Sequence, residues 1–250
     1  MDNHFIVTVK GLRKKYRNSD EEALKGVDFS VLKGEKIGLL GPNSAGKTTL
    51  ISILCGILKF NTGEVIVNGI DVKQFPKQIR SVIGLIPQEI ALYPNLTIKE
   101  NLKFVGRMQG LTGSILNEKT DYFLESVKLE QHCAKLVSKC SGGIKRRANL
   151  VAGLIHNPSI IFFDEPTLGV DPQSRSLIFD FIEDLNKKGA TIIYTTHYMR
   201  EAETLCNRVE IIDNGQFVAS GTPPELIKNN EGCSDLGQVF LKLTGKDLRE

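Results

Sequence analysis

Residues 41–49, GPNSAGKTT, combine glycines, one lysine and two neighbouring hydroxyl side chains in a pattern that binds phosphate. The pattern GxxxxGK[ST] works because glycines let the backbone curl until successive N–H groups point at phosphate oxygens. A helix that begins near Gly46 would add the positive end of its dipole. Lys47 would reach the β- and γ-phosphates of a nucleotide, and the Thr48 hydroxyl would ligate Mg²⁺. The candidate residues are Gly41, Pro42, Asn43, Ser44, Ala45, Gly46, Lys47, Thr48 and Thr49.

Two acidic residues, Asp164 and Glu165, end the apolar run IIFFDE at 160–165. Ligands of an open parallel sheet collect at the carboxyl ends of its strands, so carboxylates placed there would face bound phosphates. We expect Asp164 to hold Mg²⁺ directly or through water, and Glu165 to orient the attacking water and accept its proton. An isolated Asp-Glu pair can also begin an ordinary loop, so this interpretation depends on the phosphate loop.

The segment 140–155, CSGGIKRRANLVAGLI, has the form of a second helix start that could bind an anion. Ser141 is a typical N-cap, Gly142 and Gly143 allow close backbone approach, and three basic residues follow at 145–147. A simple helix cap is the alternative interpretation. Because one phosphate loop already serves one nucleotide, a second anion site would serve the nucleotide of another molecule.

The elements that must position these residues alternate between strands and helices. Short apolar runs, several of them unbroken by polar residues, suit strands that are buried on both faces. Helical stretches fall between them, which predicts a doubly wound α/β architecture around a parallel sheet. We expect strands at 27–31, 36–40, 64–67, 82–86, 160–163, 191–195 and 209–212, and helices at about 46–58, 173–187 and 198–206.

The alternation stops between residues 88 and 157, which we expect to form an inserted helical subdomain. Residues 97–100, TIKE, have the form of a capping box, and the segments after them keep helical spacing. The remaining parts of this single domain would be a nucleotide-binding core over 1–87 and 158–221. Residues 222–250 begin with Thr-Pro-Pro-Glu and predict a C-terminal extension of short helices.

Composition limits the classes of partner. A chain of 250 residues with 41% hydrophobic content can bury a substantial core, and its net charge of +3 gives no overall attraction to nucleic acid. The amino terminus lacks the pattern of a secretory signal, and the longest nearly apolar run, 51–58, is shorter than the roughly 18 residues of a membrane span. Five cysteines form no CxxC pair, and we expect Cys55 in the core. These features predict a cytoplasmic chain that reaches a membrane only through a partner.

With these motifs in order, the chain resembles the nucleotide-binding subunit of ABC transporters from about residue 5 to its end. Tyr16 looks like the aromatic that stacks on adenine, and Gln88 in LIPQE resembles the glutamine that links Mg²⁺ to the helical subdomain. CSGGI, 140–144, stands at the place of the signature motif. LGVD, which ends at Asp171, resembles the loop that crosses a dimer interface, and His197 resembles the histidine that contacts the γ-phosphate.

Each of these residues also has an ordinary structural alternative. Tyr16 could be a surface aromatic, Gln88 an ordinary loop residue, and His197 a histidine that only satisfies the structure behind a buried strand. Asp171 precedes a proline, so we expect it to be a helix N-cap as well as an interface residue.

The resemblance implies a P-loop ATPase with a RecA-like core, an N-terminal antiparallel β subdomain, and ATP with Mg²⁺ as ligands. It also implies a head-to-tail pair of ATPase subunits in which Ser141, Gly142 and Gly143 of one cap the nucleotide of the other, as a homodimer or a heterodimer. Closure of the pair would pull on a separate integral membrane permease through a groove near residues 88–97. The chain would then be peripheral on the inner face of the membrane, and GVDPQSR and HYMREAE most resemble export-type subunits.

Two departures from the family pattern concern the site itself. The signature usually begins with Leu and ends with Gln, but Cys140 and Ile144 stand here, so one amide side chain is missing from the shared site. Ser44 stands where glycine is usual; its side chain is small, and we expect it to be tolerated if its φ is negative.

Two other classes of function compete with transport. A soluble ABC ATPase that acts on ribosomes or nucleic acid usually carries two ATPase domains or a long coiled-coil arm, whereas this chain carries one domain and an insertion of moderate length. A nucleotide kinase or switch GTPase would share the phosphate loop but needs neither the SGG helix nor Glu165 and His197. Transport is therefore favoured, and no nucleic-acid partner is expected.

Overall fold

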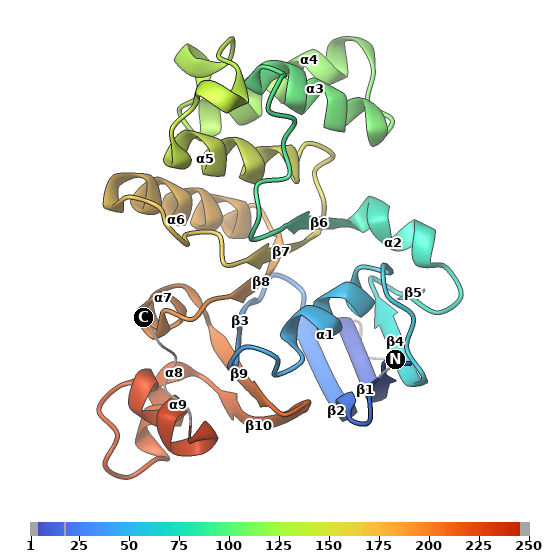
Figure 1. Ribbon diagram of the computed structural model, residues 1–250, viewed down its shortest axis with the longest axis vertical. Helices are drawn as coiled ribbons and strands as arrows, with labels where there is room; N and C mark the ends of the chain where they lie inside the picture. The colour runs from blue at the N-terminus through green and yellow to red at the C-terminus, as the bar shows by residue number, and fades with distance from the viewer. Residues whose placement is uncertain (1–4, 18, 246–250) are drawn as a thin grey trace.

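A central six-stranded sheet forms the middle of the molecule in the computed structural model, which describes residues 5–17 and 19–245 (Figure 1). The predicted domain limits at residues 1 and 250 lie outside these residues. The strand order is β10-β9-β3-β8-β7-β6, and every neighbouring pair is parallel except β9 with β10. The strands are β3 (Lys36–Leu40), β6 (Ile83–Ile86), β7 (Ile160–Asp164), β8 (Thr191–Thr195), β9 (Arg208–Asp213) and β10 (Gln216–Gly221).

A second sheet of four antiparallel strands, in the order β2-β1-β4-β5, packs beside the central one. Residues 64–67, which the sequence groups with the strands buried on both faces, belong to this sheet. Val65 and Val67 are buried but Glu64 is exposed, so this strand buries one face only, as antiparallel strands often do. The strands are β1 (Phe5–Lys15), β2 (Glu22–Leu32), β4 (Thr62–Val67) and β5 (Ile70–Asp71).

Two hydrophobic cores lie on opposite faces of the central sheet. In β7, Ile160 and Phe162 belong to the core shared with the antiparallel sheet, whereas Ile161 and Phe163 belong to the core shared with the helices. Side chains alternate across a strand, so a strand buried on both faces must be apolar at every position. This explains the unbroken runs in β7 and β8.

Three helices, α3 to α5, occupy most of residues 88–157 and lie together at the top of the molecule in Figure 1. The capping box at the start of α3 is confirmed, because Thr97 and Glu100 exchange hydrogen bonds of 3.2 and 2.8 Å. The division of the chain into subdomains stays a prediction. The helices are α3 (Ile98–Met108), α4 (Gly113–Ser126) and α5 (Gly142–Ala152), with 3₁₀ turns at Glu130–His132 and Val137–Lys139.

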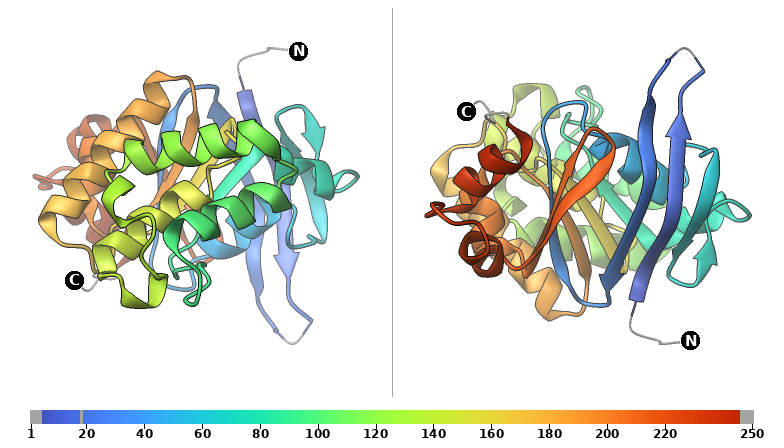
Figure 2. Two further views of the ribbon diagram at one scale, coloured as in Figure 1. Left: turned by 90° about the horizontal axis from the view of Figure 1, so that it is seen from above. Right: turned by 90° about the horizontal axis from the view of Figure 1, so that it is seen from below.

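The other helices pack against the central sheet or the end of the chain. The helix expected over 46–58 ends at Leu54, because the chain turns at Gly56, where φ is +65° and a Cβ would lie 2.6 Å from the Pro76 carbonyl oxygen. Seen from below, α8 and α9 lie on the opposite side of the central sheet from β1 and β2 (Figure 2). No helix in the described part of the chain has the length and apolar character of a membrane span. The helices are α1 (Lys47–Leu54), α2 (Pro76–Val82), α6 (Pro172–Lys187), α7 (Met199–Leu205), α8 (Pro223–Lys228) and α9 (Leu236–Thr244).

Phe162→Ala tests whether the central sheet depends on its two cores. Phe162 is 0% exposed, so its truncation should lower the free energy of unfolding by about 3–5 kcal/mol through the cavity that it leaves. Phe5, also on a strand, is 51% exposed, and Phe5→Ala should change the same quantity by less than about 0.5 kcal/mol. Urea unfolding of both variants gives the comparison, and equal losses would refute this account of the core.

Candidate functional site

The phosphate loop joins the carboxyl end of β3 to the start of α1. Two of its glycines are required by their surroundings. A Cβ on Gly41 would lie 2.3 Å from the Ile212 carbonyl oxygen, and Gly46 has φ +111° with the Ala23 carbonyl oxygen 2.8 Å from the position of its Cβ. Gly46 caps α1 with no side-chain hydrogen bond, so the first N–H groups of the helix point into the loop without an internal partner.

Ser44 does not meet the condition for easy tolerance, a negative φ, because its φ is +68°. The Ala45 N–H donates to the Pro42 carbonyl at 3.2 Å, which closes a turn with Ser44 as its third residue. That position of a type II turn needs a positive φ, which glycine adopts without strain. For serine, the backbone strain of this conformation costs about 1–2 kcal/mol.

Lys47, the first residue of α1, lies between the loop and the two acidic residues. Its ammonium donates to the carbonyl oxygens of Gly41 and Pro42 at 2.5 and 3.0 Å. Burial lowers the pKa of Lys47, and the carboxylates of Glu165 and Asp164 oppose that shift. The lysine is therefore held by weak neutral acceptors, which phosphate oxygens can replace.

Thr195, at the end of β8, holds in place both Asp164, the last residue of β7, and Glu165, which follows it. Its hydroxyl donates to Asp164 Oδ1 at 2.7 Å, and its carbonyl and hydroxyl oxygens both accept from the Glu165 N–H, at 3.1 and 3.2 Å. Glu165 has φ +48°, a strained value that these bonds stabilise. The Glu165 carboxylate then lies 3.1 Å from Nδ1 of His197, and both side chains are largely buried.

One cavity of about 290 Å³ collects most of the predicted residues. Three predicted residues lie just outside this lining. Gly41 and Pro42 accept hydrogen bonds from Lys47, and His197 contacts Glu165. Donors of the loop face carboxylates across this space, as a nucleotide with a bound cation would require. The lining residues are Tyr16, Ala23, Asn43, Ser44, Ala45, Gly46, Lys47, Thr48, Thr49, Gln88, Asp164 and Glu165.

Tyr16 lies at the mouth of this cavity. Its ring is 43% exposed, its hydroxyl lies 3.1 Å from the Thr49 hydroxyl, and the Lys14 ammonium lies 5.0 Å from the ring centroid. An exposed aromatic ring next to a cation can stack on a planar base. The position is compatible with the predicted contact to adenine.

Ser141, Gly142, Gly143 and Asp171 do not line this cavity. Ser141 is the exposed N-cap of α5, and its side chain makes no capping hydrogen bond. A Cβ on Gly143 would lie 2.8 Å from Asp171 Oδ2, so the start of α5 packs directly on the start of α6. Asp171 caps α6 by accepting from the Ser174 N–H at 2.9 Å, and this bond lowers the pKa of the Asp171 carboxyl.

Two basic residues of α5 do not face an anion as the sequence suggests. The Arg147 guanidinium donates to the carbonyl oxygens of Val127 and Lys128, and Arg146 is buried among carbonyl oxygens near Glu165. Sequence reasoning also missed Thr195. The signal for Thr195 was its place at the carboxyl end of a strand predicted to lie in the same parallel sheet as β7.

The oxygen donors in the cavity suit Mg²⁺. The Thr48 hydroxyl, the Gln88 amide and the Asp164 carboxylate all line the same space. Mg²⁺ prefers oxygen ligands and is commonly held by one or two carboxylates together with substrate phosphates. Within the described residues no group of three or more His, Cys, Asp or Glu side chains is placed to hold a metal ion.

Comparisons with known proteins identify the family. The family model described as ABC transporter matches residues 24–168, and the chain belongs to this family. It is 42% identical over 98% of its length to the linearmycin resistance ATP-binding protein LnrL of Bacillus subtilis (strain 168), covering 76% of that protein. It is 40% identical over 97% of its length to the Nod factor export ATP-binding protein I of Ralstonia nicotianae, covering 74% of it.

Solved structures give the same result for the fold. An ATP-binding subunit of an ABC transporter superposes with a TM-score of 0.85 at 28% identity, covering 95% of this chain and 99% of that one. A dimeric ATP-binding cassette in a post-hydrolysis state with ADP and Pi superposes with a TM-score of 0.78 at 26% identity, covering 86% of this chain and 98% of that one. The predicted P-loop α/β fold with its antiparallel β subdomain is confirmed, and the chain is an ATPase of the ABC family.

Ser44→Val tests the strain in the phosphate loop. A β-branched residue at φ +68° should lower the free energy of unfolding by about 1–2 kcal/mol relative to serine, whereas Ser44→Gly should equal or exceed the wild type. Ser114→Val is the control, because Ser114 is exposed in the first turn of α4, where φ is helical and the two residues have similar propensity. Urea unfolding checks the order, and a Ser44→Val variant as stable as wild type would contradict a left-handed Ser44.

Proposed function

We propose that this chain is the ATP-hydrolysing motor of a membrane exporter, working as one of two paired ATPase subunits beneath a separate permease. The observation that carries the proposal is the cavity where the phosphate loop faces Asp164, Glu165 and Gln88. Support for export comes from relatives named for Nod factor export and for linearmycin resistance, which match nearly the whole chain. Such a subunit would lie on the inner face of the membrane.

Hydrolysis would use the residues in this order. The loop N–H groups and the start of α1 bind the phosphates, and Lys47 leaves its carbonyl partners to contact the β- and γ-phosphates. Glu165 accepts a proton from the water that attacks the γ-phosphorus, while the bond from this phosphorus to the bridging oxygen of the β-phosphate breaks and ADP leaves. His197 orients the Glu165 carboxylate through their contact of 3.1 Å. Thr48, Asp164 and Gln88 would hold Mg²⁺, which neutralises charge on the β- and γ-phosphates when it is bound.

The second half of the site would come from a partner subunit. Ser141 is exposed, makes no side-chain capping bond, and begins an 11-residue helix whose first N–H groups lack side-chain acceptors. Nothing lies within 4 Å of the Cβ position of Gly142, so the helix tip is open to another molecule. A similar cassette was solved as a dimer with ADP and Pi, which supports a pair that encloses the nucleotide.

Glu165→Gln tests the hydrolytic step. The amide cannot accept the proton of the attacking water, so the rate of ATP hydrolysis should fall by about 10²–10⁴-fold while ATP is still bound. The trapped nucleotide should also stabilise the pair, which light scattering with ATP and Mg²⁺ detects. Glu64→Gln, at an exposed glutamate of β4, is the matched control and should hydrolyse at the wild-type rate. Full activity of Glu165→Gln would remove Glu165 from the mechanism.

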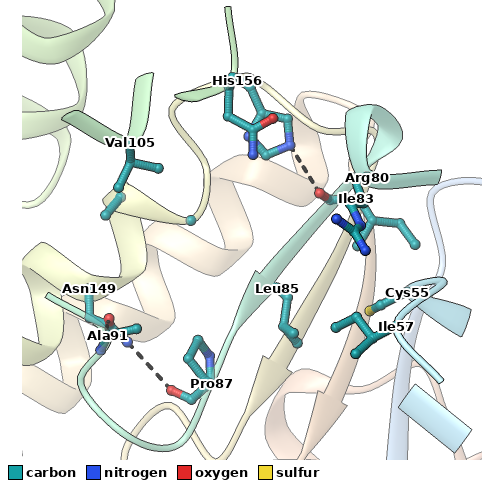
Figure 3. Close-up of a pocket in the computed structure, with 13 residues that line it drawn as sticks. Cys55, Ile57, Arg80, Ile83, Leu85, Pro87, Ala91, Val105, Asn149 and His156 are labelled. Atoms are coloured by element: carbon teal, nitrogen blue, oxygen red, sulfur yellow. Dashed lines mark hydrogen bonds between the residues drawn. The ribbon is translucent and has the colours of Figure 1, made fainter. Parts of the chain in front are cut away.

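A second cavity, of about 530 Å³, fits the proposed contact with the permease (Figure 3). It lies where β6 and the segment after it meet α5, and Leu85, Val105 and Pro87 give it apolar walls. Ile57, which also lines the cavity, is 60% exposed, so its apolar side chain is accessible beside these walls. The cavity adjoins the predicted groove near residues 88–97, since Ala91 also lines it.

Ile57→Asp tests this docking surface in cells that express the chain from its own locus. A carboxylate in an apolar contact costs several kcal/mol, so the chain should shift from the membrane pellet to the supernatant by at least about tenfold. Purified Ile57→Asp should keep its ATPase rate.

Ile115→Asp provides the control, because Ile115 is 56% exposed on α4, away from this cavity. It should sediment as the wild type does. Sedimentation of the wild type with ribosomes or nucleic acid instead of membranes would contradict the transport proposal.

A further inference from the structure

Arg146 is a buried cation whose partners are backbone carbonyl groups. The residue is 3% exposed and lies in the second turn of α5. Its Nε donates to the Pro166 carbonyl at 2.6 Å, its Nη1 donates to the Gln88 and Pro87 carbonyls at 2.6 and 3.1 Å, and its Nη2 donates to the Glu165 carbonyl. Arginine is almost never so buried without partners that satisfy its donors. The four carbonyl groups provide those partners.

The carbonyl groups belong to two separate segments, and each segment carries a residue of the candidate site. One pair follows β6 and includes Gln88, and the other follows β7 and includes Glu165. Both side chains line the nucleotide cavity, whereas Arg146 does not. A planar guanidinium has five N–H donors in a fixed geometry, so it sets the distance and the orientation between the two segments.

The hydrogen bond from Arg146 to the Glu165 carbonyl group matters because the backbone of Glu165 is strained. Its φ of +48° is costly for a residue with a side chain, and such a conformation persists only when neighbours hold it. Thr195 holds the N–H of Glu165 and Arg146 holds its carbonyl group, so the peptide groups before and after Glu165 are both fixed. Rotation of the backbone at Glu165 would move the carboxylate away from His197 and from the cavity.

We propose that Arg146 is a positioning residue for ATP hydrolysis, which places Glu165 and Gln88 through their backbone carbonyls and ties both to α5. The proposal rests on the roles proposed above for Glu165 and Gln88. Because α5 also presents Ser141, the same helix joins the surface offered to the partner subunit with the two segments that surround the attacking water. Arg146 contacts neither nucleotide nor water in this account.

Arg146→Lys tests the proposal, because lysine keeps the charge but its single ammonium cannot span both carbonyl pairs. We expect kcat to fall by about 10–100-fold, since small displacements of reacting groups cost that much, with KM for ATP within about threefold of wild type. The Mg²⁺ concentration for half-maximal rate should rise, because Gln88 loses its anchor. A purely structural role would lower thermal stability without this division between kcat and KM.

Arg147→Lys is the matched control. Arg147 is the next residue of the same helix and also donates to two carbonyl oxygens, of Val127 and Lys128, but neither of these residues lines the nucleotide cavity. Its kcat and Mg²⁺ dependence should stay within about twofold of wild type. If Arg146→Lys loses no more kcat than Arg147→Lys, the proposal is wrong.

Two further variants, Arg146→Gln and Glu165→Gln, separate a loss of folding and a loss of the base from a loss of positioning. If Arg146→Lys does not fold, Arg146→Gln is measured in the same way, and an unchanged kcat overturns the proposal while a selective loss of kcat supports it. Glu165→Gln, assayed alongside, separates the two ideas. Full activity of Glu165→Gln refutes the proposed base, whereas its inactivity together with a fully active Arg146→Lys refutes the positioning role alone.

Discussion

The site depends on the adjacency of β3, β8 and β7 in one parallel sheet. Thr195 at the end of β8 pairs with Leu39 of β3 on one side and with Asp164 of β7 on the other. Parallel strands deliver their carboxyl ends to the same edge, so the phosphate loop after β3 and the carboxylates at the end of β7 must face each other. Opposite charges therefore face each other across the cavity, and the carboxylates of Glu165 and Asp164 act to raise the pKa of Lys47.

This arrangement costs backbone energy that the rest of the fold must offset. Ser44 and Glu165 both have positive φ values, and each lies where the chain leaves a strand of the central sheet towards the cavity. Together they cost about 2–4 kcal/mol by the usual scale for left-handed residues. The sheet can hold them because it is buried on both faces by two separate cores. The apolar strands thus stabilise the sheet that carries the strained residues of the site.

Local patterns explain how much could be read from the sequence alone. The phosphate loop, the pair Asp164-Glu165 and the cap at Asp171 depend on residues close together in the chain, and the structure places each where its spacing predicts. Strands β1 and β10 were not predicted, because β1 mixes buried with exposed positions and β10 has no fully buried position. The left-handed φ of Ser44 could not be predicted from the sequence, because the turn geometry, not the size of the side chain, decides φ there.

Contacts between distant segments could not be predicted in the same way. Arg146 appears in the sequence as one of three basic residues at a helix start, yet it is buried and reaches carbonyl groups 58 and 19 residues away. No periodicity distinguishes it from Lys145, whose side chain is only partly buried. Its direction follows from the packing of α5 against the segments after β6 and β7, which is a property of the assembled fold.

The position of Arg146 in α5 gives the tip of this helix and its second turn different roles in the proposed mechanism. Ser141 and Arg146 are separated by five residues, or roughly 7–8 Å along the axis, and a helix transmits a displacement over that length with little bending. A partner that moves the tip at Ser141 therefore moves the guanidinium and, through it, the carbonyl groups of Gln88 and Glu165. Because Gln88 also lies next to the segment that borders the second cavity, the same displacement reaches the proposed permease contact. In the proposed mechanism, nucleotide capture, hydrolysis and movement of the groove are linked by one rigid helix rather than by a flexible loop.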